Sequence, residues 1–283
     1  MPELPEVEVC RRQLARWTNG RALDAVTVVD RAVVRKQLST KPSDVAPDGA
    51  EQLARLVGRV PDEPVRYGKR LGWAFGDRGL LCHLGMTGEW VRRPTGDPQP
   101  DLARLALRFG DHTLWYLDGR RFGCVVVVPA PEIAAGVKGD QGPDLVLEPV
   151  DAATLAARVR SRKPIKVALM EQDRVAGLGN IHAAEACFRA KISPRRKADG
   201  LTPTEWATLN DAISTQLRWS IDAEGEHDEL VYVNLGGPNP FSVYKKDGEP
   251  CPVCRTPIAS EDLGGRTTYW CPRCQPDPDP ERA

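Results

Sequence analysis

Hydrophobic positions in the first twenty residues repeat with the period of a helix. Val7, Cys10, Leu14 and Trp17 fall on one helical face, and Gly20 is suited to end the helix. From residue 22 to 128 the pattern changes to short apolar runs separated by Gly-Asp and Asp-Gly pairs, which indicate strands and turns. We expect strands at 25–29, 72–75, 80–84, 105–109, 113–117 and 124–128, and one short helix over 50–57. Many short strands behind one leading helix predict a β-sandwich or a barrel.

The second half of the chain shows helical patterns instead. Residues 131–150 are rich in proline and glycine and lack periodicity, which predicts a linker. Helices are expected at 152–162, 165–172 and 180–190. Thr202-Pro203-Thr204-Glu205 is a capping box with proline at the first helical position. The long helix that it begins has an apolar stripe formed by Trp206, Leu209, Ile213, Leu217 and Ile221.

Length and charge narrow the class of protein. The 283 residues suffice for two domains with their own cores. No apolar run is long enough to span a membrane, and the N-terminus lacks a secretory signal, so we expect a cytoplasmic protein without a membrane partner. The 39 basic and 39 acidic residues cancel, which is not the overall basic footprint typical of nucleic-acid-binding proteins. Any nucleic-acid-binding site must therefore come from local clustering of basic residues.

Four of the eight cysteines form a metal-binding pattern. Cys251-Pro-Val-Cys254 and Cys271-Pro-Arg-Cys274 have the C-x₂-C spacing of a tetrahedral zinc site. Four thiolates leave no open coordination position, so we expect one structural Zn²⁺ that holds a β-hairpin. Arg266 follows two glycines in the turn of that hairpin, where it is suited to grip a phosphate. The remaining cysteines are expected to be buried, reduced thiols: Cys10, Cys82, Cys124 and Cys187.

The N-terminus carries the most distinctive chemistry. Methionine ahead of so small a residue as Pro2 is normally removed, which leaves a free secondary amine flanked by carboxylates, the first of them Glu3. Such an amine can attack a carbonyl-like carbon, and its adduct is an iminium that has no N–H to lose. From these residues alone, the alternative is that Pro2 and Pro5 merely stiffen the start of a helix.

Glycine-bounded loops carry further candidate contacts. His83-Leu84-Gly85-Met86-Thr87-Gly88 and Asp118-Gly119-Arg120-Arg121-Phe122-Gly123 each follow a predicted strand. Apolar side chains on such loops beside arginines resemble the wedges of proteins that kink DNA. Lys69 belongs to a basic segment, and Gly177-Leu178-Gly179-Asn180 is a turn at a helix N-terminus that could bind an anion, with Lys163 one helix earlier.

Together these motifs resemble those of the formamidopyrimidine-DNA glycosylases, in the helix–two-turn–helix superfamily that also includes endonuclease VIII. The similar segments are Pro2 to Glu8, the region of Lys69, His83 to Gly88, Asp118 to Gly123, Gly177 to Glu185, and the zinc hairpin with Arg266. The resemblance implies an α+β multidomain protein. Its expected parts are an N-terminal β-sandwich (1–130), a linker (131–150), a helix–two-turn–helix domain (151–240), a zinc finger (241–276) and a tail (277–283).

The resemblance also implies a function. A monomer would bind double-stranded DNA that contains oxidised bases or abasic sites, remove the base through a Schiff base on Pro2, and cleave the strand by β,δ-elimination. Glu3 would carry protons, Lys69 would assist proton transfer, and Arg266 would grip phosphate beside the reacting nucleotide. Met86, Arg120 and Phe122 would fill the space left by the flipped nucleotide. Further DNA contacts are implied for His83, Arg121, Lys163 and Asn180.

Three features depart from the family pattern. Gly119 replaces the usual proline, His182 stands where tyrosine is common, and Leu230–Val243 is shorter than the usual lesion-covering loop. Because that loop helps to read oxidised purines, oxidised pyrimidines remain an alternative to 8-oxoguanine and formamidopyrimidines opposite cytosine. A catalytically silent binder of damaged DNA is a second alternative, which the intact Pro2-Glu3 pair disfavours. A zinc-ribbon interaction protein would leave the motifs before residue 190 unexplained.

Overall fold

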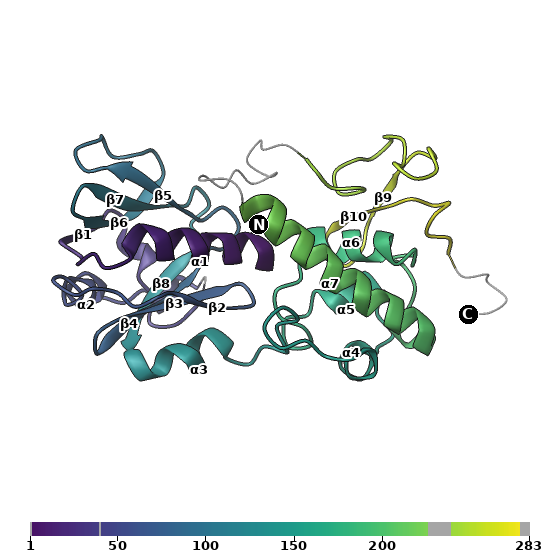
Figure 1. Ribbon diagram of the computed structural model, residues 1–283, viewed down its shortest axis with the longest axis horizontal. Helices are drawn as coiled ribbons and strands as arrows, with labels where there is room; N and C mark the ends of the chain where they lie inside the picture. Colours follow the sequence, from purple (N-terminus) through teal and green to yellow (C-terminus); the bar gives the residue numbers. More distant parts are fainter. Residues whose placement is uncertain (1, 40, 226–238, 278–283) are drawn as a thin grey trace. The chain divides into compact units, whose positions relative to one another are not determined.

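A computed structural model describes residues 2–39, 41–225 and 239–277, and the chain divides into two compact units (Figure 1). The first unit contains the described residues up to Gly139, and the second contains Asp140–Ala223 with the described residues from Asn239 to Asp277. This division falls inside the predicted linker. Most of the expected lesion-covering segment and all of the expected tail after Asp277 lie outside the described residues.

Two four-stranded antiparallel sheets build the first unit, as a β-sandwich requires. One sheet has the order β2-β3-β4-β8, formed by Val65–Tyr67, Arg70–Phe75, Arg78–His83 and Cys124–Pro129. The other has the order β1-β6-β7-β5, formed by Ala25–Val28, Ala103–Phe109, His112–Leu117 and Glu89–Pro94. All six predicted strands are present, and β2 and β5 are additional.

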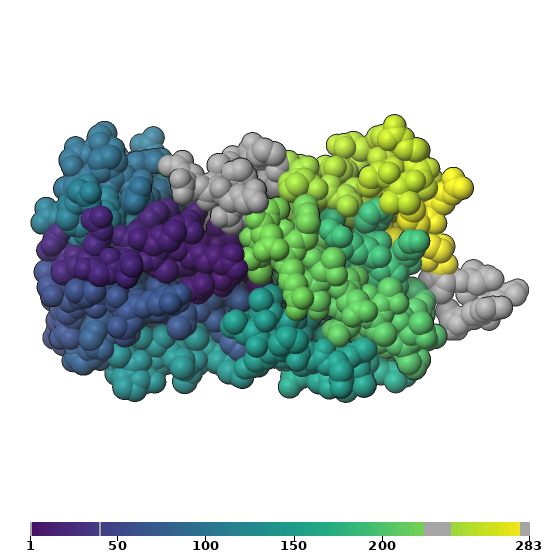
Figure 2. Space-filling model, viewed as in Figure 1, coloured from purple at the N-terminus to yellow at the C-terminus, as the bar shows by residue number. Residues whose placement is uncertain are grey.

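The leading helix α1 (Leu4–Thr18) packs against both sheets of this unit. It contacts β2 and β3 of one sheet and β5 of the other, and its outer face reaches the surface between them (Figure 2). The predicted apolar face is buried in a core that includes Trp73, Trp90 and Tyr116. The rings of Trp73 and Trp90 lie 5.8 Å apart, and those of Trp90 and Tyr116 lie 5.1 Å apart. The sandwich and its leading helix are therefore as predicted.

Two short helices cover parts of this unit, α2 (Gly49–Ala54) and α3 (Ile133–Lys138). The expectation that residues 131–150 lack regular structure is wrong for α3. Ile133 and Val137 are buried against the sheet, where glycines make room for them. A Cβ on Gly72 would lie 2.7 Å from Ile133, and one on Gly79 would lie 2.3 Å from it. An apolar pair four residues apart therefore suffices to dock this helix.

The second unit is helical and ends in a hairpin. Its elements are α4 (Ala152–Val159), α5 (Ile165–Leu169), α6 (Asn180–Arg189), α7 (Pro203–Gly225), β9 (Ala259–Asp262) and β10 (Thr267–Trp270). The capping box of α7 forms as predicted: the Thr202 N–H donates to Glu205 Oε2 over 2.8 Å, and the Glu205 N–H donates to Thr202 Oγ1 over 3.3 Å. The predicted apolar stripe of α7 is buried throughout.

Candidate active site and metal centre

Pro2 and Glu3 lie immediately before the first turn of α1. Glu3 is the N-cap residue, with φ −107° and ψ −171°, and its N–H donates to Glu6 Oε2 over 2.9 Å. Both Pro2 and Glu3 are buried, and Glu3 is 1% exposed. Pro5 lies in the first turn, where its fixed φ suits a helix start. The residue that would become the N-terminus is therefore held against the fold.

Lys69 occupies the two-residue turn between β2 and β3. Tyr67 and Arg70 pair across the hairpin, so Gly68 and Lys69 alone connect the strands. Gly68 has φ +55°, which fits the first central position of a type II′ turn. Lys69 is 9% exposed. A tight turn and an enclosed side chain thus fix this lysine in place.

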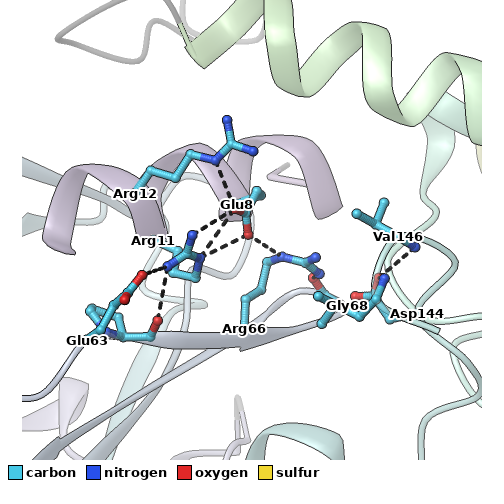
Figure 3. A network of polar contacts seen from close by, with 10 residues as sticks. Glu8, Arg11, Arg12, Glu63, Arg66, Gly68, Asp144 and Val146 are labelled. Carbon is cyan, nitrogen blue, oxygen red and sulfur yellow. Dashed lines mark hydrogen bonds and ion pairs between the residues drawn. The ribbon is translucent and has the colours of Figure 1, made fainter. Parts of the chain in front are cut away.

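A charged network ties α1 to this turn (Figure 3). Glu8 Oε2 accepts from Arg66 Nε over 3.0 Å, and Arg66 Nη1 donates to the Gly68 carbonyl over 3.2 Å. Arg11 and Arg12 also donate to Glu8 Oε1, over 3.0 and 2.9 Å. Burial alone would raise the pKa of Glu8, but the hydrogen bonds and charges of its arginine partners outweigh burial and lower the pKa. Hydrogen bonds of charged side chains therefore connect α1, which begins beside the candidate nucleophile, with the turn that carries Lys69.

His83 ends β4, and the loop that follows it carries Met86. The Gly85 N–H donates to His83 Nδ1 over 3.1 Å, and the Gly88 N–H donates to the Leu84 carbonyl over 2.8 Å. Because Nδ1 accepts, the proton of the neutral ring lies on Nε2, which can donate to a ligand. Desolvation, followed by nearby basic residues, lowers the pKa of His83 to about 4. The ring is therefore a neutral donor near pH 7.

The loop between β7 and β8 carries Arg120 and Phe122. Buried Asp118 holds it: Oδ1 accepts from Thr87 Oγ1 over 2.6 Å and from the Arg120 N–H over 3.1 Å. Its Oδ2 accepts from the Gly123 N–H over 2.7 Å. The Arg120 guanidinium lies 5.0 Å from the centre of the Phe122 ring, and Phe122 is 38% exposed. The structure thus presents an exposed aromatic residue and a cation together.

Two of the predicted DNA-binding cations are engaged in ion pairs. Arg121 has φ +59°, and its Nε lies 3.2 Å from Asp30 Oδ2. Lys163 Nζ pairs with Glu171. Both side chains remain more than half exposed, at 65% and 53%, so a DNA phosphate would have to compete with an existing carboxylate partner.

Asn180 begins α6, as expected, after a turn in which Gly177 has φ +92°. Its side chain joins two other elements of the second unit. Buried Lys166 on α5 donates to Asn180 Oδ1, and Asn180 Nδ2 donates to the Thr267 carbonyl on β10 over 2.9 Å. The helix N-terminus and the hairpin that carries Arg266 are therefore joined through this one amide.

Glu185 on α6 has a role that the sequence did not indicate. It is 1% exposed and accepts three backbone N–H groups, from Ser242, Val243 and Tyr244, over 2.8–2.9 Å. Three such bonds satisfy the acceptor capacity of a buried carboxyl group that has little contact with water. Glu185 thereby fixes the segment that leads into the zinc hairpin.

The four cysteines of the predicted zinc site converge. Their Sγ atoms lie within 4.8 Å of one another, with Cys251 and Cys274 3.9 Å apart and Cys254 and Cys271 3.4 Å apart. Tetrahedral zinc with Zn–S bonds of about 2.3 Å requires sulfur separations of about 3.8 Å. The donors and their spacing therefore fit one structural Zn²⁺.

The pKa values of two of these thiols shift in opposite directions. Burial and the neighbouring thiols raise the pKa of Cys274 to about 12, whereas hydrogen bonds from Thr256 lower the pKa of Cys254 to about 6. Four adjacent thiols cannot all ionise cheaply without a positive charge among them, and zinc supplies it. The other four cysteines are buried, as predicted, and desolvation raises their pKa values.

Arg266 is exposed in the hairpin turn between β9 and β10. Gly264 and Gly265 have φ of +63° and +76°, and the Gly265 N–H donates to Asp262 Oδ1 over 2.9 Å. The Leu263 N–H donates to the Arg266 carbonyl over 3.0 Å. The turn is thus defined by its own hydrogen bonds, while the side chain of Arg266 stays accessible.

Comparisons with known proteins cover the whole of this arrangement. Residues 1–125 match the formamidopyrimidine-DNA glycosylase N-terminal domain, 141–230 match the H2TH domain of that enzyme, and 248–276 match the zinc finger found in FPG and IleRS. A formamidopyrimidine-DNA glycosylase of Geobacter sulfurreducens is 37% identical over 282 residues, which cover 97% of this chain and 100% of the relative. The chain belongs to the formamidopyrimidine-DNA glycosylase family.

Solved structures of family members have the same fold. MutM in complex with DNA containing carbocyclic 8-oxo-G has a TM-score of 0.84 and 31% identity, covering 98% of this chain and 100% of that one. Lactococcus lactis Fpg in complex with DNA containing an oxidized pyrimidine has a TM-score of 0.85 and 31% identity, with the same coverage. The predicted family, fold class and zinc site are confirmed.

The sequence motifs located the candidate residues but not the contacts that hold them. The partners Thr87 of Asp118 and Arg66 of Glu8 are 31 and 58 positions away along the chain. The sequence signal that could have pointed to Asp118 was its position, an acidic residue directly after a predicted strand.

Among the described residues, no helix has the length and apolar character needed to cross a membrane.

Proposed function

We propose that this chain is a DNA glycosylase with abasic-site lyase activity that acts in base excision repair. The observation that carries the proposal is the Pro2-Glu3 pair, held at the start of α1 in a chain that matches the family from end to end. A protein that only bound damaged DNA would need neither the amine nor the adjacent carboxyl.

The chemistry follows from a secondary amine. The nitrogen lone pair of Pro2 forms a bond to C1′ of the damaged nucleotide while the bond from C1′ to the base breaks, and the base leaves with a proton. Opening of the sugar gives a cationic iminium, which acidifies the hydrogens at C2′. Removal of one C2′ proton expels the 3′ phosphate, and a further elimination expels the 5′ phosphate. Hydrolysis of the iminium then frees Pro2.

Acid–base and phosphate contacts come from the surrounding residues. Glu3 is the proton carrier at the sugar, and Lys69 assists proton transfer and contacts phosphate. His83 donates from Nε2 as a neutral group, and Asn180 and Arg266 contact phosphates around the flipped nucleotide. The zinc ion, once bound, supplies only the fold of the hairpin, because all four positions are filled by sulfur.

Met86, Arg120 and Phe122 replace the extruded nucleotide in the DNA stack, with Arg120 toward the orphaned base. For the substrate we favour 8-oxoguanine and formamidopyrimidines opposite cytosine, supported by the family name and by the relative bound to carbocyclic 8-oxo-G DNA. Oxidised pyrimidines are the second candidate, supported by the Lactococcus relative bound to such DNA.

Borohydride trapping tests this function. Reduction during turnover should convert the iminium into a stable protein–DNA adduct on duplexes carrying 8-oxoguanine, a formamidopyrimidine, an oxidised pyrimidine or an abasic site. Pro2→Gly leaves a primary amine, whose imine can lose its proton and its charge, so it should form the adduct more slowly while retaining duplex binding, whereas Pro5→Ala should trap like the wild type. Binding to all of these duplexes without any adduct would establish a silent damaged-DNA binder instead.

A further inference from the structure

Two loops of the first unit carry the three residues that we assign to the void in the DNA. We propose that Asp118 and Thr87 are positioning residues that lock these loops together, so that Met86, Arg120 and Phe122 enter the DNA as one preformed wedge. This inference rests on the proposed function, because it concerns how the lesion nucleotide is replaced in the stack.

The lock is a closed set of hydrogen bonds between the loops. The Thr87 hydroxyl donates to Asp118 Oδ1 over 2.6 Å and accepts from the Arg120 N–H over 3.2 Å. The same N–H also lies 3.1 Å from Asp118 Oδ1. Thr87 directly follows Met86 in the chain. Asp118 of the second loop therefore holds Thr87, the neighbour of Met86, and Thr87 of the first loop holds the backbone of Arg120.

Backbone packing brings the loops close enough for this lock. A Cβ on Gly85 would lie 2.4 Å from the carbonyl carbon of Phe122 and 2.5 Å from the nitrogen of Gly123. A Cβ on Gly123 would lie 1.7 Å from the Tyr116 hydroxyl. Gly85 has φ +62°, a conformation that favours glycine. The absence of a side chain at Gly85 also leaves room for the backbone of the second loop.

Preorganisation is what the lock would contribute to the reaction. Inserting side chains between bases interrupts base stacking, which costs free energy at each step that is opened. Loops that became ordered only on DNA binding would lose conformational entropy in that step, and this loss would add to the cost of opening the stack. Buried Asp118, 1% exposed, with three donors on its two oxygens, holds the wedge before DNA arrives.

A purely structural role and a wedge-positioning role predict different substrate dependences. Excision from a duplex requires the wedge, because extrusion of the damaged nucleotide leaves a gap in the stack opposite an orphaned base on the partner strand. Cleavage of a single-stranded abasic oligonucleotide uses the Pro2 chemistry without any gap to fill. A mutation that disturbs only the wedge should therefore lower the rate of excision from the duplex and leave cleavage of the single strand unchanged.

The test uses full-length protein with zinc and compares Thr87→Val, which removes the hydroxyl at nearly constant volume, with Thr87→Ser, which keeps it. Thr95→Val is the matched control, since the Thr95 hydroxyl bonds to the Gly110 carbonyl and to Thr113 Oγ1, and among the described residues it makes no hydrogen bond to either wedge loop. We measure kcat/KM for 8-oxoguanine excision opposite cytosine, cleavage of the single-stranded abasic oligonucleotide, and thermal unfolding.

We expect Thr87→Val to lower duplex excision about tenfold, as loss of one charge-assisted hydrogen bond implies. Single-strand cleavage should stay within about twofold of wild type, and Thr87→Ser should restore duplex excision. In a background that already lacks the Phe122 ring (Phe122→Ala), Thr87→Val should add much less than tenfold, because both changes act on the same wedge.

Several results would overturn the inference. Equal losses on the duplex and the single strand, wild-type duplex excision by Thr87→Val, or full additivity with Phe122→Ala would each do so while leaving the proposed function intact. A wild-type protein that neither releases bases nor traps a covalent adduct would instead remove the proposed function, and this inference with it. Asp118→Asn provides a second variant with the same expected pattern.

Discussion

The wedge loops of the first unit and the zinc hairpin of the second each present an arginine, yet they are fixed by different means. The loop with Arg120 grows out of two strands of a sandwich and is held by one buried carboxylate, that of Asp118. The hairpin with Arg266 has only two strands, and its small core consists of Phe188, Val243 and Ile258 beside Cys251 and Cys271. Isolated two-stranded hairpins are marginally stable. A loop on a deep core can rely on hydrogen bonds, whereas the hairpin depends on its metal.

Zinc removal is the strongest way to probe this contrast. Cys251→Ser, or chelation, should release the hairpin and weaken duplex binding about 100-fold through loss of the Arg266 contact. The midpoint of the unfolding transition of the β-sandwich should not change. Binding titrations and hydrogen exchange of β9 and β10 measure both effects, with Cys124→Ala as the control for loss of a buried thiol that binds no metal. Undiminished binding by the chelated protein would show that the hairpin does not depend on zinc.

Gly85→Ala probes the loop side of the comparison. The added Cβ meets the Phe122 backbone and is placed at φ +62°, so we expect a loss of about 3 kcal/mol in the free energy of unfolding. Gly20→Ala is matched to it, with φ +65° and no atom within 4 Å, and should cost about 1 kcal/mol. Denaturant unfolding compares them. Equal costs would mean that close packing of the loops contributes nothing.

Glu8→Gln tests whether charge also organises the first unit at α1. Arg66 would keep its buried charge but lose a carboxylate partner, which should lower the free energy of unfolding by about 2 kcal/mol at pH 7. Exposed Glu51→Gln is the control and should change it by less than about 0.5 kcal/mol. Denaturant unfolding at pH 7 supplies both values.

The effect of Glu8→Gln should also depend on pH. The pKa of Glu8 in the folded protein lies below its ordinary value of 4.5. Its contribution is therefore complete above pH 4.5 and declines as the pH falls through the lower folded value. The difference between wild type and Glu8→Gln should shrink in acid, and a difference that grows there would contradict the assigned charge network.

Thr202→Ala is the mildest change and concerns only the second unit. Loss of the α7 capping box should cost about 1 kcal/mol, and Thr202→Ser should retain most of it. Thermal unfolding measures the cost, and borohydride trapping on an abasic duplex should remain at the wild-type level. A large loss of trapping would show that the start of α7 matters for the chemistry as well as for stability.

The sequence predicted central elements better than edges and better than contacts. The missed strands, β2 and β5, both lie at sheet edges. In β5, Glu89 to Pro94, three charged residues flank the apolar pair Trp90-Val91, so no longer apolar run reveals the strand. Helix α3 was missed because only Ile133 and Val137 dock it. The zinc ligands were predictable because their spacing is local. The long-range partners, Thr87 of Asp118 and Arg66 of Glu8, were not predictable, because only the tertiary fold brings them together.

The central claim is that the N-terminal nitrogen of Pro2 attacks the sugar. Mass mapping of the borohydride-trapped complex after nuclease and trypsin digestion tests it most directly. We predict that the reduced sugar remnant lies on the peptide of residues 2–11, attached at Pro2, and that Met1 is absent from every trapped molecule. A remnant on a lysine-containing peptide, or on a peptide that retains Met1, would contradict the account.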